Sequence, residues 1–207
     1  GLKLQGYPIS SSGSVGTAVA DIQLVADSSG FFTSTPVKTT SVTAISNLGN
    51  DGSSDVTSDP NNPFFSLVSA YNGKNDPPLS SSSYSYSESL KVYDENGEGH
   101  NLTIYYDQVS SAGGSTQWEF TVAMDPSEDA SAFAGTSSAG LLMMGTLSFN
   151  SSGSLTSMSA FTPKAGTTGS LQDLNNWTTS GFDSDGLPQF NATFTSTANG
   201  SATTATN

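Results

Sequence analysis

Residues 87–106 have the pattern of a β-hairpin, and this pattern limits the fold more than any other segment of the chain. Apolar side chains alternate with polar ones in both arms of the segment: Leu90, Val92, Leu102, Ile104 and Tyr106. A period of two residues is typical of a strand with one buried face and one face toward water. We therefore predict two strands of a sheet that has one wet face.

The turn between these arms is chemically specified. Asn96-Gly97 is a pair that adopts positive φ at low cost, and Gly99 adds a residue suited to a bulge or a wider loop. A short turn of this kind joins neighbouring strands that run in opposite directions. The two arms are therefore predicted to pair antiparallel.

Alternating segments recur toward the carboxyl end of the chain. One strand is predicted at 118–124, a second hairpin around the turn at 150–153, and a last strand at 190–194. The apolar residues that define these elements are Trp118, Phe120, Val122, Met124, Leu147, Phe149, Leu155, Phe190, Ala192 and Phe194. Many short strands with frequent turn signals, and almost no helical period, predict an all-β fold, an antiparallel β-barrel or sandwich.

Two segments before the hairpin also have strand-like patterns. Residues 19–25 alternate, and the face with Ala20, Ile22 and Leu24 is the one predicted to be buried. A further strand is predicted around 42–45.

The other segments carry weaker signals. Residues 64–68 are an apolar patch between two loop-like segments and are predicted to pack under the sheet. The segment 125–139 holds a short helical turn, because Pro126 suits the first helical position. From Thr195 to Asn207 the chain consists of small and polar residues, which predicts a tail that is flexible or that depends on a missing partner segment.

Charge and cysteine content exclude several classes of function. The chain has 18 acidic residues against 5 lysines and arginines, a formal net charge of −13. Nucleic acid and anionic membranes both require basic patches, so neither is expected as a partner. The absence of cysteine removes disulfides and thiolate chemistry. No apolar run approaches the length of about 20 residues that spans a bilayer.

The turn of the hairpin has a partial calcium pattern. Asp94, Asn96, Glu98 and Gly99 match the early positions of a calcium-binding loop. In the twelve-residue calcium loop counted from Asp94, the last position falls on Tyr105, where a bidentate carboxylate is needed. The loop is also predicted to lie between strands, whereas a calcium loop of this kind lies between helices. We therefore predict no metal site and no cofactor.

His100 is the only histidine in the sequence. No histidine cluster for zinc can form, and a Ser-His-Asp triad would have to assemble around a hairpin residue. We predict that His100 instead makes a hydrogen bond that orders the turn. The segment Asp183-Ser184-Asp185-Gly186 is interpreted as an Asx turn in the same way.

Paired carboxylates for a glycosidase would have to come from Asp107, Glu119, Asp125 or Asp173. The sequence does not fix their separation, and we interpret them as surface groups that favour solubility. Because no histidine, metal or nucleophile set converges, we predict no catalytic residue and no enzyme activity.

Aromatic residues raise an alternative function for this chain, that of an extracellular carbohydrate-binding or adhesin β-domain. Trp118 belongs to the core pattern, whereas Trp177 lies among Asn175, Asn176 and Thr178 and is the candidate for an exposed sugar-stacking face. A buried aromatic is the more common outcome. The alternative predicts a glycan affinity that falls when Trp177 is replaced by alanine.

Four motifs, in this order along the chain, resemble the flagellar hook proteins of bacteria. They are Leu4–Pro8, Leu90–Tyr106, Gln117–Phe120 and Gly145–Leu155. The positions that match the signature of the outer domain of that family are Leu90, Val92, Tyr93, Asp94, Gly97, His100, Leu102, Trp118, Leu147, Phe149 and Gly153. The role that the resemblance implies for them is structural.

The resemblance implies a division of the chain. Residues 1–36 would be strands that belong to, or lead out of, the inner hook domain, and residues 37–207 would be the outer β-barrel-like domain. The chain would be a fragment, with the terminal helices that line the hook channel outside it. A second alternative is a related axial protein of the flagellar rod or of the rod-proximal hook, which the resemblance at Gly6-Tyr7-Pro8 also allows. The large insert after Ser41 favours the hook.

The resemblance also implies a function without catalysis. The protein would be a structural subunit that polymerises into the hook, the curved tube that connects rod to filament and transmits torque as a universal joint. Its partners would be neighbouring hook subunits and, at the ends of the tube, other flagellar axial proteins. It would be extracellular, after export by the flagellar type III apparatus. We expect the chain on its own to be monomeric.

Overall fold

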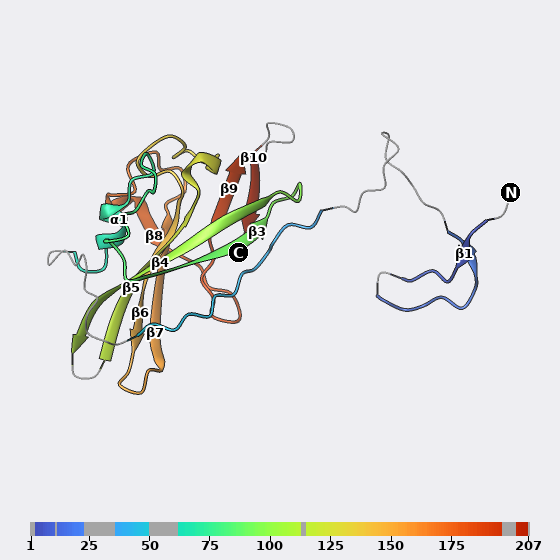
Figure 1. The fold of residues 1–207 in the computed structure, drawn as a ribbon, viewed down its shortest axis with the longest axis horizontal. Helices are drawn as coiled ribbons and strands as arrows, with labels where there is room; N and C mark the ends of the chain where they lie inside the picture. Colours follow the sequence, from blue (N-terminus) through green and yellow to red (C-terminus); the bar gives the residue numbers. More distant parts are fainter. Residues whose placement is uncertain are drawn as a thin grey trace. The chain divides into compact units, whose positions relative to one another are not determined.

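Six antiparallel strands form the main sheet of the protein, and their order in the sheet follows their order in the chain (Figure 1). The computed structural model describes residues 3–10, 12–22, 36–49, 62–112, 115–195 and 202–206. The strands of the main sheet are β3 (Tyr86–Tyr93), β4 (Gly99–Ala112), β5 (Ser115–Met124), β6 (Leu141–Phe149), β7 (Leu155–Pro163) and β8 (Trp177–Thr179). The predicted all-β class is confirmed.

The chain divides into two units, Gly1–Thr35 and Pro36–Asn207. Among its described residues, 3–10 and 12–22, the first unit contains one antiparallel pair, β1 (Gln5–Gly6) and β2 (Ala20–Asp21). Besides the main sheet, the second unit contains α1 (Ser66–Ala70), two 3-10 turns, η1 (Pro126–Glu128) and η2 (Leu174–Asn176), and the strands β9 (Asn191–Thr195) and β10 (Ala202–Thr206).

The first predicted hairpin is confirmed as β3 and β4. Leu90 pairs with Leu102 and Val92 with His100, so the apolar side chains of the two arms share one face. Gly97 has φ +80°, the left-handed conformation that the Asn-Gly pair predicts. The turn sets the register of such a hairpin. The register matters because a slip of one residue would move every apolar side chain to the other face of the sheet.

The second predicted hairpin is confirmed as β6 and β7. The side chain of Asn150 accepts hydrogen bonds from the backbone N–H groups of Ser152 and Ser154, both at 3.0 Å, and Gly153 has φ +77°. Leu155, one of the apolar residues of the predicted hairpin, begins β7 and is exposed.

One face of the main sheet is covered by the carboxyl-terminal strands. β9 pairs antiparallel with β10, and Figure 1 shows this dark red pair beside β3 and β4. The buried residues of this core cluster are Val92, Leu102, Tyr106, Trp118, Phe120, Val122, Met124, Leu142, Met143, Ala160, Phe190, Ala192 and Phe194. Val42 and Leu48 pack against the same cluster from the segment before the hairpin.

The other face of the sheet is covered at β5, so the prediction of one wet face is wrong there. α1 and nearby loops bury a second apolar cluster against it: Phe65, Leu67, Val68, Tyr71, Leu79, Ala123, Phe133, Leu141, Met144, Leu171 and Trp177. The alternation in β5 suggested that its polar residues face water, but the side chains of Glu119 and Thr121 are buried. The apolar patch at 64–68 therefore does pack under the sheet, as predicted, with Phe64 left exposed.

Three further predictions need correction. Residues 42–45 form no strand; the segment instead meets the edge of β3 through Thr39, whose N–H donates to the carbonyl of Tyr93 at 2.9 Å. Ala20 and Ile22 are exposed, because a two-stranded sheet has no second layer to bury them, and Leu24 lies outside the described residues. The tail predicted to be flexible includes β10, whose threonine-rich sequence suits a strand.

Gly145 gives a test of how tightly the sheet is packed. A Cβ at this position would lie 2.6 Å from the ring of Phe120 and would also clash with the carbonyl of Ser159 on the neighbouring strand. We expect Gly145→Ala to lower the free energy of unfolding by about 2–3 kcal/mol, as measured by denaturant titration. Gly153→Ala is the matched control: its φ is +77° but no atom lies within 4 Å, so about 1 kcal/mol is expected. Equal losses in the two variants would contradict this description of the packing.

Candidate functional site

The turn between β3 and β4 is built around Asp94, whose side chain is fully buried. Its Oδ1 accepts hydrogen bonds from the backbone N–H groups of Asn96 and Glu98 at 2.9 and 2.8 Å. Its own N–H donates to the carbonyl of Glu98 at 3.0 Å, and Gly97 donates to the carbonyl of Asp94 at 3.1 Å. Asp94 therefore closes the turn through its backbone and through one carboxylate oxygen.

His100 follows the turn on β4 and is also buried, with 4% of its surface exposed. Its Nδ1 lies 3.0 Å from a carboxylate oxygen of Glu128, and its ring stacks on Phe194 with centroids 4.0 Å apart and an angle of 11° between the planes. His100 thus makes a hydrogen bond, but this bond joins β4 to η1, so the prediction that it orders the turn is wrong.

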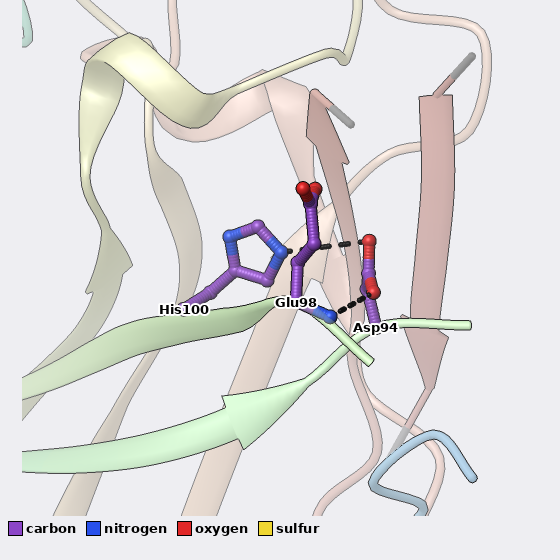
Figure 2. A group of neighbouring side chains, drawn as sticks. All are labelled: Asp94, Glu98 and His100. Atoms are coloured by element: carbon purple, nitrogen blue, oxygen red, sulfur yellow. Dashed lines mark hydrogen bonds and ion pairs between the residues drawn. The ribbon is translucent and has the colours of Figure 1, made fainter. Parts of the chain in front are cut away.

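Nε2 of His100 points back toward the turn. It lies 3.7 Å from Oδ2 of Asp94, which is beyond hydrogen-bond distance. The nitrogen is buried and has no hydrogen-bond partner. Figure 2 shows the imidazole beside Asp94 and Glu98, with a dashed line from the ring to Asp94.

Sequence reasoning found Asp94, Glu98 and His100 but missed two partners of the histidine. Glu128 belongs to η1, where Asp125 caps the turn by accepting from the N–H of Ser127 at 2.9 Å. Phe194 belongs to β9. No local signal links these segments to the hairpin, because Glu128 and Phe194 are far from His100 in the sequence and meet it only in the folded chain.

The signature residues occupy structural positions on the two hairpins and on β5. Those whose side chains are buried are Val92, Asp94, His100, Leu102 and Trp118. Leu90, Leu147 and Phe149 are partly buried, and Tyr93 is 44% exposed. Gly97 and Gly153 take positive φ in the two turns. The structure brings Asp94, Gly97 and His100 together and leaves the others spread over the sheet.

Two of the four carboxylates considered for catalysis lie side by side. Asp107 on β4 pairs with Glu119 on β5, and both are buried, so their interpretation as surface groups is wrong. Burial raises the pKa of Glu119 to about 8; the N–H of Leu67, 3.2 Å from its carboxylate, opposes this shift, whereas the charge of Asp107 adds to it. The hydroxyl of Ser85 donates to Asp107 at 3.0 Å.

The remaining acidic candidates hold turns together. Asp125 and Asp173 cap η1 and η2, each accepting a hydrogen bond from the N–H two residues later. Asp183 accepts from the N–H groups of Asp185 and Leu187 at 2.9 and 2.8 Å, which confirms the predicted Asx turn.

Trp177 is not an exposed sugar-stacking residue. Its side chain is buried, and its indole N–H donates to the carbonyl of Leu171 at 2.7 Å. The aromatic platform on which the carbohydrate-binding alternative rested is therefore absent at this residue.

Fold and site together define an antiparallel β-domain whose buried acidic groups and histidine hold its own turns and strands in place. Within the described ranges, no helix has both the length and the apolar character to cross a bilayer.

Residues 60–206 match the family described as "Flagellar basal body protein FlaE D2 domain". No curated protein and no solved structure matches the chain. The family match covers more than half of the sequence, and the chain belongs to this family. It is thus part of a flagellar hook-type structural protein, a component of the extracellular hook region of the flagellum.

Proposed function

We propose that the protein is a hook subunit that polymerises into the curved tube between rod and filament and transmits torque through it. The family match over 60–206 is the observation that carries this proposal. Contacts in such a tube must break and re-form as the tube rotates, and small polar interfaces suit that motion better than a hydrophobic core does. The segment 72–83, rich in asparagine, serine and proline, offers a surface of this kind.

The two parts of the chain take different roles in this proposal. Residues 1–36 are strands of the inner domain or lead out of it, and 37–207 form the outer domain. The exposed apolar side chains of the first part support this role, since a two-stranded sheet is marginal alone. Among its described residues these are Leu4, Tyr7, Ile9, Val15, Val19 and Ile22.

Two loops are the proposed contacts with neighbouring outer domains, 72–83 and 125–140. Two hydrogen bonds show that these loops are next to each other. The N–H of Gly73 donates to the carbonyl of Ser137 at 2.8 Å, and the hydroxyl of Tyr71, just before the first loop, donates to the carbonyl of Ala139 at 2.8 Å. Their proximity supports one continuous contact surface. Other axial proteins would bind at the ends of the tube, and the subunit would reach it by flagellar type III export.

Immunogold electron microscopy of the source cells tests the proposal, with antibody raised against the 207-residue chain. We expect label confined to a short curved segment between the cell surface and the filament. The antibody absorbed with excess purified chain is the control and should give no label. Label along the filament, or scattered over the envelope, would contradict the proposal.

A further inference from the structure

We propose that Asp94, Glu98 and His100 form a binding site for a divalent transition-metal ion, with Zn²⁺ as the best match. Among the described residues these three offer two carboxylates and one imidazole, and their candidate ligand atoms all lie within 4.8 Å of one another. The proposed site involves only residues at the hairpin turn and the start of β4. The proposal does not depend on the hook function.

The buried Nε2 of His100 is the observation that points to a ligand. A buried ring nitrogen without a hydrogen-bond partner is costly, and this one faces a fully buried carboxylate, Asp94, at 3.7 Å. A metal ion between the two groups would satisfy the nitrogen lone pair and the carboxylate at once. If His100 were protonated instead, it would bridge Asp94 and Glu128 as a cation, and this is the rival description.

The surroundings of His100 are those of a metal-binding histidine. Its second nitrogen, Nδ1, lies 3.0 Å from the carboxylate of Glu128, and such a bond orients the ring of a ligating histidine. The stacked ring of Phe194 holds the imidazole plane in place. The ligand is thus oriented from both sides before any ion binds.

The donor set selects the ion. One imidazole nitrogen and two carboxylates suit Zn²⁺, whereas Ca²⁺ takes six to eight oxygen ligands. Zinc bonds of about 2 Å place tetrahedral ligand atoms about 3.3 Å apart, so the group has to contract on binding. Glu98 is the partly exposed member, and we expect its side chain to make most of this movement. Three protein ligands leave the fourth position to water.

Nuclear magnetic resonance and calorimetry test the site on the chelator-treated 207-residue chain. Because His100 is the only histidine, its ring signals are unambiguous. On addition of Zn²⁺ we expect the Nε2 signal to shift more than the Nδ1 signal, one ion to bind per chain, and the melting temperature to rise. Ca²⁺ at the same concentration should leave the ring signals unchanged.

Glu98→Gln and Glu95→Gln are the matched variants, since both remove one charge from the same turn. Glu98→Gln keeps the backbone bonds of the turn and should weaken Zn²⁺ binding about tenfold or more. Glu95 pairs with Lys38 at 3.2 Å outside the site, and Glu95→Gln should bind Zn²⁺ like the unchanged chain. No Zn²⁺ effect on the Nε2 signal, equal weakening in both variants, or tighter binding of Ca²⁺ than of Zn²⁺ would overturn the proposal.

Discussion

Replacing Phe194 with alanine is expected to lower the free energy of unfolding by about 3–5 kcal/mol. Phe194 is fully buried on β9, at the point where the carboxyl-terminal strands cover the main sheet. Its ring stacks on His100, so the substitution removes core contacts and also one side of the histidine pocket. Denaturant titration followed by tryptophan fluorescence measures the loss, because Trp118 lies in the same core cluster.

Phe182→Ala is the control for this substitution. It removes the same side chain from a position that is 42% exposed, and we expect a loss of less than about 1 kcal/mol. Similar free energies of unfolding in the two variants would contradict this prediction. They would mean that β9 does not cover the main sheet and contributes little to the core.

The hairpins were predictable from sequence because their information is local. Asn96-Gly97 and the 150–153 turn specify the chain reversal within a few residues, and the alternation on either side specifies the buried face. The core positions Val92, Leu102 and Trp118 follow directly from that alternation. Such features need no knowledge of what packs against the sheet.

The covered second face was not predictable in the same way. α1 has five residues, which is too short for a helical period to emerge in the sequence. Without that helix, the polar residues Glu119 and Thr121 have the pattern of a solvent face. Trp177 was misjudged for a related reason, since its polar sequence neighbours say nothing of Leu171, whose carbonyl accepts its indole N–H.

The candidate site was predictable only in part. The turn chemistry brings Asp94 and Glu98 together within one short segment, and strand register adds His100. The orientation of His100 depends on Glu128 and Phe194, which come from a 3-10 turn and a strand far along the chain. The calcium-loop template failed at Tyr105 because it requires its last ligand from the same loop, whereas here a histidine on the following strand lies beside the two carboxylates.

The second large predicted effect is a loss of stability as the pH rises, and it comes from the side chain of Glu119. Burial raises the pKa of this carboxyl from an ordinary value of 4.5 to about 8 in the folded protein. The folded state therefore holds a proton that the unfolded state releases between these values. This contribution to stability is fully present below about pH 4.5 and is lost as the pH rises through about 8. We expect the free energy of unfolding to fall by a few kcal/mol over that range, since each pKa unit corresponds to about 1.4 kcal/mol.

Glu119→Gln is expected to remove most of this pH dependence. The glutamine is neutral at every pH, and its carbonyl oxygen can still accept the hydrogen bond from the N–H of Leu67. Denaturant titrations at several pH values from 5 to 9 measure the slope for both proteins. Glu95→Gln, at an exposed glutamate, should keep the slope of the unchanged chain. A slope that survives in Glu119→Gln would place the responsible proton on another group and contradict this prediction.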